Sequence, residues 1–382
     1  MANVLTDLAA DIYKAADTVG RELTGAVSSV IVNGDGSERA ALNDTVRSHF
    51  TRQPSGSSPI AESMTVPEGD DQTIDTKTVS ITKAQAIQVP WTGEDMRHVS
   101  NGAGFETIYG DQIAQAMRTL ANEIEFDMLT ELYQNASRAY GTAGTTPFGT
   151  NFDEVANIRQ ILVDNGCPVD QLTMVMNTTA GTSLRNLAQL QKANEAGSAS
   201  LLRQGVLLDL QGIALKESAG VRSHTKGTGT GYLVNNGAGI LAGGTAIASD
   251  TGSGTVLAGD VVTFAADSAN KYVVNTALSG GSFAIGDNGA QVAIADNNAI
   301  TVGDSYAANV AFRRTAAELV IRPPAVPNGG DLADDAMIVQ DPWSGLTFEI
   351  RVYNGYRKRM FEVAAAWGVK AWKPEHIAVL LG

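Results

Sequence analysis

Residues 105–137 read FETIYGDQIAQAMRTLANEIEFDMLTELYQNAS, and this run organises the whole 382-residue chain. Apolar residues recur three or four positions apart, the spacing of one helix face, at Ile113, Met117, Leu120, Ile124, Met128 and Leu132. No Pro or Gly interrupts the run after Gly110. At 1.5 Å per residue the helix would be roughly 40 Å long. The usual helix of about 11–12 residues is only about 17 Å long at the same rise. The run therefore predicts a structural spine.

Two patterns precede this helix. Residues 3–30 carry apolar residues at helical spacing and predict an amphipathic helix, followed after Gly34-Asp35-Gly36 by a short helix or strand to about Phe50. Residues 51–91 begin rich in Pro and Ser, become acidic near residues 68–71, and then alternate as strands do. They predict a two-stranded excursion. Because a lone hairpin is marginal in water, we expect it to lie on this chain's body or on a neighbour.

A mixed α/β segment follows the spine. Asn151, with Glu154 three residues later, predicts a helix that begins with a capping box. Gly166 predicts the end of that helix. A strand at 172–176 and a helix near 182–192 come next.

The composition changes at about Arg222, where glycine becomes frequent and helical periodicity disappears. Short β-like runs recur at residues 231–234, 260–264, 271–274 and 283–285. Strands at this spacing predict a small all-β barrel or sandwich. Mixed character returns near Ala316, so the β module is an insertion whose two ends must lie close together.

The C-terminal stretch alternates, with Phe348, Ile350 and Val352 on one face and Glu349 and Arg351 on the other. A basic cluster accompanies it, interleaved with tyrosines: Arg351, Arg357, Lys358 and Arg359. The cluster suits either DNA contact, or ion pairs with the acidic excursion of another subunit, or ordinary solvated charge. A formal net charge of −14 favours ion pairs, because phosphate binding needs dense Lys and Arg.

Signals for catalysis are weak throughout. The four histidines are far apart, no HExxH or CxxC spacing occurs, and the single cysteine, Cys167, excludes an intramolecular disulfide. The glycines at 236–243 do not keep the GxGxxG spacing, and no helix pattern follows them. Adjacent Asp334 and Asp335 on a loop would point apart. We therefore expect no enzyme, no cofactor and no metal. No run of about 18 apolar residues and no signal peptide is found, so we expect no membrane segment.

The order of these parts resembles the HK-ninety-seven-type capsid fold, and the β insertion makes the chain similar to the coat-protein family of the short-tailed Salmonella phage type. The resemblance runs from about residue 45 to the end and rests on VPWTGE (89–94), MRTLANEIE (117–125), AGDVVTFA (258–265) and the C-terminal residues 361–370 and 373–375. The first 40 residues match less well, so the resemblance does not give the path of the arm.

The resemblance implies an α+β fold with an inserted, barrel-like β domain. The domains it implies are an N-terminal arm (1–44), an extended loop or β-hairpin (45–92), a peripheral domain with the spine helix (93–165), an axial domain (166–221), the inserted β domain (222–316), the axial return (317–346) and the peripheral C-terminal strands (347–382).

The function implied is that of a major capsid protein of a tailed double-stranded-DNA bacteriophage. Such a protein assembles in the host bacterial cytoplasm as hexamers and pentamers of an icosahedral shell and becomes part of the virion. Its partners would be itself, a scaffolding protein, a portal, a decoration protein, and packaged DNA held weakly and without sequence preference. The extended loop would contact the adjacent subunit, through Glu68, Asp70, Asp71 and Lys77. Covalent Lys–Asn cross-linking, which one branch has, would involve Lys77 or Lys83 on the loop, with no partner identified.

Three other functions remain open from the sequence, of which an enzyme has the least support because no site converges. A nanocompartment shell could use the same fold, and a neighbouring cargo-enzyme gene would favour it. A glycan- or adhesion-binding protein could use the inserted β domain as its binding face, and glycan binding by residues 222–316 would favour it.

Overall fold

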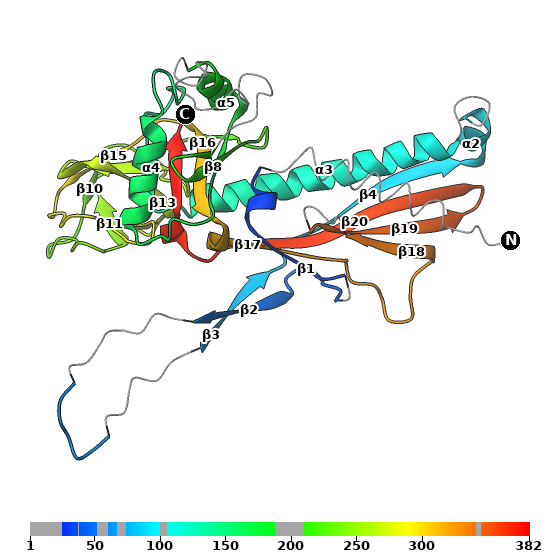
Figure 1. Cartoon of the computed structure of the whole chain (residues 1–382), viewed down its shortest axis with the longest axis horizontal. Helices are drawn as coiled ribbons and strands as arrows, with labels where there is room; N and C mark the ends of the chain where they lie inside the picture. Colours follow the sequence, from blue (N-terminus) through cyan, green and yellow to red (C-terminus); the bar gives the residue numbers. More distant parts are fainter. Residues whose placement is uncertain are drawn as a thin grey trace.

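The computed structural model describes residues 25–36, 38–51, 60–66, 74–99, 105–187, 209–340 and 345–382. The chain has an α+β fold, as predicted, in which one long helix runs beside a sheet and a two-stranded hairpin projects from the body (Figure 1). The long helix α3 spans Phe105–Gln134, so the predicted spine is confirmed. Its apolar stripe is buried, with Ile113, Met117 and Ile124 fully covered.

A six-stranded sheet packs on α3 and is organised around its longest strand, β20 (Lys358–Ala371). Strand β4 (Lys83–Thr92) pairs with one edge of β20. Strands β17 (Ala317–Arg322) and β19 (Thr347–Gly355) share the other edge, one after the other. Beyond them lie β1 (Ile31–Gly34) and β18 (Ala333–Gln340). The short helix α2 (Gly93–Val99) follows β4 directly.

The two faces of this sheet differ as predicted. Phe348, Ile350 and Val352 join the core beneath α3, so Glu349 and Arg351 lie on the opposite face. On the helix side, Trp367 is fully buried and its indole Nε1 donates to Asp127 Oδ2 at 2.9 Å. Burying so large a ring together with its polar atom fixes α3 on the sheet.

A second sheet continues from the far end of α3. Its strands in spatial order are β5 (Arg138–Tyr140), β21 (Ile377–Leu381), β16 (Tyr306–Arg313), β6 (Leu172–Met176), β8 (Ile213–Glu217) and β7 (Asp209–Leu210). β9 (Ser223–His224) pairs with the start of β16. Helix α4 (Asp153–Asp164) packs on this sheet, α5 (Thr178–Arg185) follows β6, and two 3-10 turns, η2 (Arg314–Ala316) and η3 (Pro374–His376), connect strands.

The predicted inserted β-barrel is present. β10 (Tyr232–Val234), β11 (Ala246–Asp250), β14 (Ser282–Ile285), β13 (Asp267–Ser279), β12 (Val261–Phe264) and β15 (Ala299–Val302) pair in that order, and β15 pairs back with β10. Every pairing is antiparallel. Because β15 pairs with β10, the ring closes without a free edge. The barrel is continuous with the second sheet, because the long strand β13 also pairs with β5.

The projecting hairpin consists of β2 (Thr45–Thr51) and β3 (Ile74–Ser80), paired from Thr45↔Ser80 to Thr51↔Ile74. The prediction that the excursion extends to Trp91 was wrong in one respect. Strand β4 belongs to the six-stranded sheet, where Ile87 and Val89 pack against the core under α3. Alternation predicts which side chains share a face, but it does not reveal which strand is the partner.

Three local predictions need correction. Residues 3–24 lie outside the described part, but residues 25–30 form a turn and a 3-10 helix, η1 (Val27–Ser29), instead of the end of an α-helix. Phe152, not Asn151, is the N-cap of α4, and no capping box forms, since the Glu154 carboxylate accepts from the Phe148 N–H. The helix predicted near 182–192 begins at Thr178, where Asn177 caps it, and the part beyond residue 187 is not described.

The stop at Gly166 is confirmed: its φ is +78°, and the N–H groups of Gly166 and Cys167 bond to the carbonyls of Val163 and Leu162. No helix in the described part of the chain is both long and apolar enough to cross a membrane.

Candidate assembly surface

The described part of the hairpin tip, residues 60–66, is apolar and exposed. Ile60, Met64 and Val66 have exposed fractions of 105%, 106% and 85%. Three uncovered apolar side chains within seven residues leave apolar area in water that the chain itself does not bury. This surface is the feature of the described chain most suited to contact another molecule.

The hairpin root, by contrast, is firmly packed on the body. Val79 and Ile81 are buried against Ala40, Val320 and Ala366, which belong to or border the six-stranded sheet. The Asn43 N–H donates to the Ile81 carbonyl at 2.9 Å, and the Ile81 N–H donates to the Asp44 carbonyl at 2.8 Å. The root therefore sets the direction in which the hairpin projects.

Lys77, expected at a contact between subunits, lies at this root within its own chain. Its Nζ donates to the Trp372 carbonyl at 3.2 Å and stands 5.6 Å from the centroid of the Trp372 ring. The other three residues expected in that contact, Glu68, Asp70 and Asp71, lie outside the described residues.

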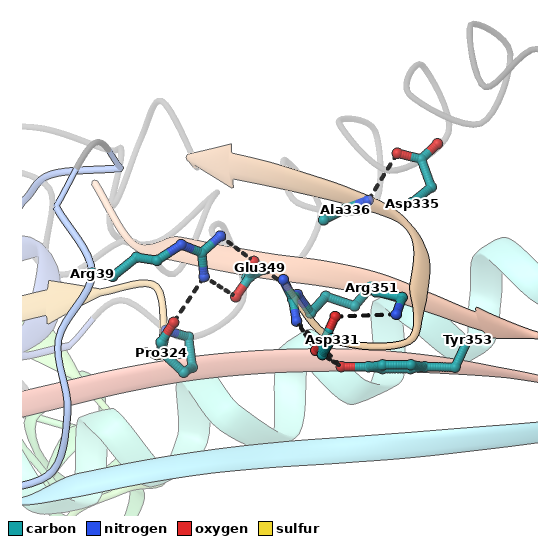
Figure 2. Close-up of polar contacts among 9 residues, drawn as sticks. Arg39, Pro324, Asp331, Asp335, Ala336, Glu349, Arg351 and Tyr353 are labelled. Carbon is teal, nitrogen blue, oxygen red and sulfur yellow. Dashed lines mark hydrogen bonds and ion pairs between the residues drawn. The ribbon is translucent and has the colours of Figure 1, made fainter. Parts of the chain in front are cut away.

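An ionic network fixes the segment just before the hairpin to the outer face of the sheet (Figure 2). The Arg39 guanidinium donates to both carboxylate oxygens of Glu349, at 2.6 and 3.0 Å, and to the Pro324 carbonyl at 2.8 Å. Glu349 is 1% exposed. Bidentate pairs of this kind are among the strong hydrogen bonds in proteins. Arg39 therefore holds the segment before the hairpin against β19.

Arg351 extends the network and is thereby withdrawn from the basic cluster. Its Nε donates to Glu349 at 3.1 Å, its Nη1 contacts Asp331, and the Tyr353 hydroxyl donates to Asp331 at 2.9 Å (Figure 2). Hydrogen bonds from the Ala333 N–H and Tyr353, with the charge of Arg351, hold the pKa of Asp331 below its ordinary value. Arg351 is only 9% exposed, so it serves its own sheet.

The rest of the basic cluster lies at the turn between β19 and β20. Arg357 and Lys358 are exposed, and Tyr356 beside them is 89% exposed. Arg359 Nε donates to Asn354 Oδ1 at 2.9 Å, and the Asn354 amide donates to Asp334 at 2.7 Å. The structure thus separates a cluster that is continuous in sequence into a buried member and three members at the turn.

The structure brings together a second set of groups that the sequence did not reveal, at the entry of the chain into the body. The buried carboxylate of Glu125 on α3 accepts from the N–H groups of Ala26 and Val27, at 2.8 and 3.0 Å, and from the Ser218 hydroxyl at 3.0 Å. Burial raises the pKa of Glu125 above its ordinary value. Glu125 therefore holds the described start of the chain against the spine.

A third polar cluster joins the spine, the barrel and the second sheet. His224 Nε2 lies 2.8 Å from Asp260 Oδ1, and its Nδ1 lies 3.4 Å from the Tyr133 hydroxyl. The Tyr306 hydroxyl donates to the Gly259 carbonyl at 2.6 Å. No signal in the sequence links these residues, because each comes from a different element. Within the described ranges, no group of three or more His, Cys, Asp or Glu side chains could hold a metal ion.

Comparisons with known proteins gave only structural matches. No protein-family model matches the chain, and no curated protein matches it. It is similar to a chain of "Capsid structure of the Cyanophage P-SCSP1u" (12% identity, TM-score 0.49, 92% of this chain and 86% of that one) and to a chain described as "Mycobacterium phage Che8" (14%, 0.46, 88% and 84%). It is also similar to a virus-like particle from Pyrococcus furiosus (9%, 0.43, 97% of each chain).

The structure itself contains the elements that the sequence resemblance implied. A projecting hairpin, a long helix on a sheet, a mixed second sheet and an inserted barrel follow one another along the chain in the expected order.

Proposed function

We propose that this chain is the major capsid protein of a tailed double-stranded-DNA bacteriophage, which assembles as hexamers and pentamers of an icosahedral shell in the bacterial cytoplasm. The observation that carries the proposal is the hairpin, whose root is packed and hydrogen-bonded to the body while its tip presents Ile60, Met64 and Val66 to solvent. A hairpin that is fixed at its root and carries exposed apolar side chains at residues 60–66 is suited to contact a second copy.

The geometry of such a contact is compatible with a closed shell. The tip and the body surface that would receive it are different parts of one chain, so the contact between copies is heterologous. Heterologous contacts close into rings when the rotation between copies permits, and otherwise they continue as open polymers. Hexamers and pentamers are the closed forms of the proposed shell.

The charge distribution supports a container for DNA more than a protein that binds it tightly. The formal net charge is −14, and Arg351 is occupied by Glu349 and Asp331. Within the basic cluster, the turn containing Arg357, Lys358 and Arg359 remains as a weak, non-specific DNA contact or as an ion-pair partner. Arg357→Glu with Arg359→Glu separates the two: normal DNA packaging by that variant would exclude the DNA contact.

The proposal includes the domain division and the partners implied by the resemblance. The axial domain would comprise the second sheet, with residues 222–316 forming the insertion, although β16 within that range pairs with β6 and β21 of the second sheet. A separate scaffolding protein, a portal and a decoration protein would complete the particle. The insertion would stabilise contacts between capsomers.

The test is assembly of the full chain, with and without a candidate scaffolding partner, followed by light scattering and negative-stain microscopy. We expect shells or capsomer-sized rings from the wild type and soluble, folded subunits from Ile60→Ser/Met64→Ser/Val66→Ser. The matched control, Val163→Ser/Val169→Ser, removes exposed apolar side chains elsewhere and should assemble normally. A wild-type chain that stays monomeric under both conditions would refute the proposal, as would normal assembly of the triple variant. Shells that enclose an enzyme in place of DNA would favour a nanocompartment.

A further inference from the structure

Asparagine followed directly by glycine occurs at seven places in the sequence, and the structure holds these places very differently. Glycine has no Cβ, so its backbone nitrogen can come close to the preceding side chain. In water this nitrogen slowly attacks the amide carbon of the asparagine side chain, and hydrogen bonds that fix either group oppose the attack. The described part of the chain includes six of the seven: Asn33, Asn165, Asn236, Asn288, Asn328 and Asn354.

Asn33 and Asn165 are held at both ends of the side-chain amide. The Asn33 Nδ2 donates to Glu318 Oε1 at 3.0 Å, and its Oδ1 accepts from Arg322 Nη2 at 3.0 Å. The Asn165 Oδ1 accepts from an arginine at 3.1 Å, and its Nδ2 donates at 2.8 Å to both a serine hydroxyl and a backbone carbonyl. The Gly166 N–H is also engaged, with a carbonyl of the preceding turn at 2.9 Å. Neither side chain can turn towards the following nitrogen without losing these bonds.

Asn354 is exposed, yet its amide is held at both ends by charged side chains. Its Nδ2 donates to Asp334 at 2.7 Å, and its Oδ1 accepts from Arg359 Nε at 2.9 Å. Gly355 is also paired with Lys358 in the ladder between β19 and β20. This site combines exposure to water with a fixed side chain, so it is a control for the effect of the hydrogen bonds.

Asn236 and Asn288 lie in turns of the inserted β domain, and each site is held through one group. The Asn236 Oδ1 accepts from the Ala238 N–H at 3.2 Å, so the amide is fixed in a side-chain turn. After Asn288 the attacking nitrogen itself is engaged, because the Gly289 N–H donates to the Gly286 carbonyl at 3.0 Å. Both sites should therefore react more slowly than a site at which neither group is held.

Asn328 is the described site at which neither group is held. Asn328 and Gly329 are both exposed, in the loop between β17 and β18. The Gly330 N–H donates to the Pro327 carbonyl at 3.0 Å and closes a turn around them. Within the described residues, no hydrogen bond from the protein involves the Asn328 amide or the Gly329 N–H. A Cβ on Gly329 would meet no atom within 4 Å, so the side chain has room to reach the nitrogen.

We propose that Asn328 is the first of these six asparagines to deamidate in the folded protein. The Gly329 nitrogen, after losing its proton to hydroxide, bonds to Cγ of Asn328. The bond from Cγ to Nδ2 breaks, and Nδ2 leaves as ammonia, so that a cyclic succinimide remains. Water then adds to either carbonyl carbon of the ring and breaks the bond from that carbon to the nitrogen. The product is aspartate or isoaspartate at position 328, with one more negative charge and no oxidation or reduction.

The test follows each site by peptide mass spectrometry after the full chain has stood at mildly alkaline pH in heavy-oxygen water. Only hydrolysis during this incubation incorporates the heavy oxygen, so losses during digestion are not counted. We expect Asn328 to react at least about tenfold faster than Asn354, whose amide is held by two hydrogen bonds. In concentrated urea the two rates should become similar, because the hydrogen bonds at Asn354 are lost.

A matched variant tests the physical reason. Arg359→Met removes the donor to Asn354 Oδ1, so the rate at Asn354 should rise by about two- to tenfold, while the rate at Asn328 should not change. Equal rates at Asn328 and Asn354 in the folded wild type would overturn the proposal. A rate difference that persists in urea would also overturn it, because local sequence and not structure would then decide the order. The same holds if another of the six asparagines reacts before Asn328.

Discussion

The pair between Arg39 and Glu349 offers the sharpest test of how the hairpin is fixed. Arg39→Met removes three hydrogen bonds, two to Glu349 and one to the Pro324 carbonyl. Glu349 is 1% exposed and would keep its hydrogen bond from Arg351 Nε. Breaking a buried ion pair costs about 3–5 kcal/mol. Because the Arg39 side chain is 34% exposed, we expect a smaller loss, about 2–3 kcal/mol of unfolding free energy.

The assay is urea denaturation of the soluble subunit as a double-mutant cycle, with Arg39→Met, Glu349→Met and the two combined. If the contact is direct, the coupling energy should be about 1–2 kcal/mol, because contacting residues are not additive. Arg47→Met, an exposed arginine on β2, is the control and should change stability by less than about 0.5 kcal/mol. Additive single and double variants would refute the role assigned to the pair.

Hydrogen exchange adds a local readout to this cycle. The Ala40 N–H donates to the Pro323 carbonyl at 3.0 Å, next to the network. In Arg39→Met the Ala40 amide should exchange faster, while amides of the barrel should not change. Faster exchange everywhere would indicate a global loss of stability instead of a loosened root.

Three further predictions concern the body of the protein. Glu125→Gln should cost about 1–3 kcal/mol in denaturant unfolding, because the new amide NH₂ would face one of the two backbone donors, Ala26 or Val27. Gly259→Ala should lower the melting temperature markedly, since φ is +93° and a Cβ would stand 2.6 Å from the Tyr133 ring. Burial, with nearby cations, lowers the pKa of His376 to about 4, so between pH 6.5 and 4 the imidazole is protonated in the unfolded state and neutral in the folded state. The free energy of unfolding should therefore decrease as the pH is lowered from 6.5 to 4, and the stability advantage of wild type over His376→Phe should shrink by about 2–3 kcal/mol. A difference that stays constant with pH would refute this.

The sequence predicted the spine because its signal is local. An uninterrupted stripe from Ile113 to Leu132 contains all the information that a helix face needs. The C-terminal strands and four of the six barrel strands, β10, β12, β13 and β14, were also predicted from local runs, whereas β11 and β15 were not. The partners of the strands were not predicted, because pairing depends on residues far away: β4 joins β20 more than 260 residues later, and β13 joins both the barrel and β5.

The same limit explains the errors at the candidate site. The spacing of Glu349 and Arg351, two residues apart on one strand, correctly predicted a shared face. Arg39 is 310 residues from Glu349, and no local pattern around Arg39 predicts that the two residues pair. Arg351 was grouped with Arg357 through proximity along the chain, although the sheet buries one and exposes the other.

Strand β20 has a consequence for how the molecule carries mechanical load. Its ladder with β4 runs without interruption from Lys358↔Thr92 to Trp367↔Lys83. Ladder hydrogen bonds are perpendicular to the strands, so a force along β20 shears all of them at once, whereas a force at one end peels them singly. The opposite edge is divided between β17 and β19, and a pull along β20 is therefore passed to both halves of the sheet. Tension applied along the strands would be shared across many hydrogen bonds. A pull on the β19–β20 turn would act on one end of the ladder and break its hydrogen bonds one at a time, so the sheet would open there first.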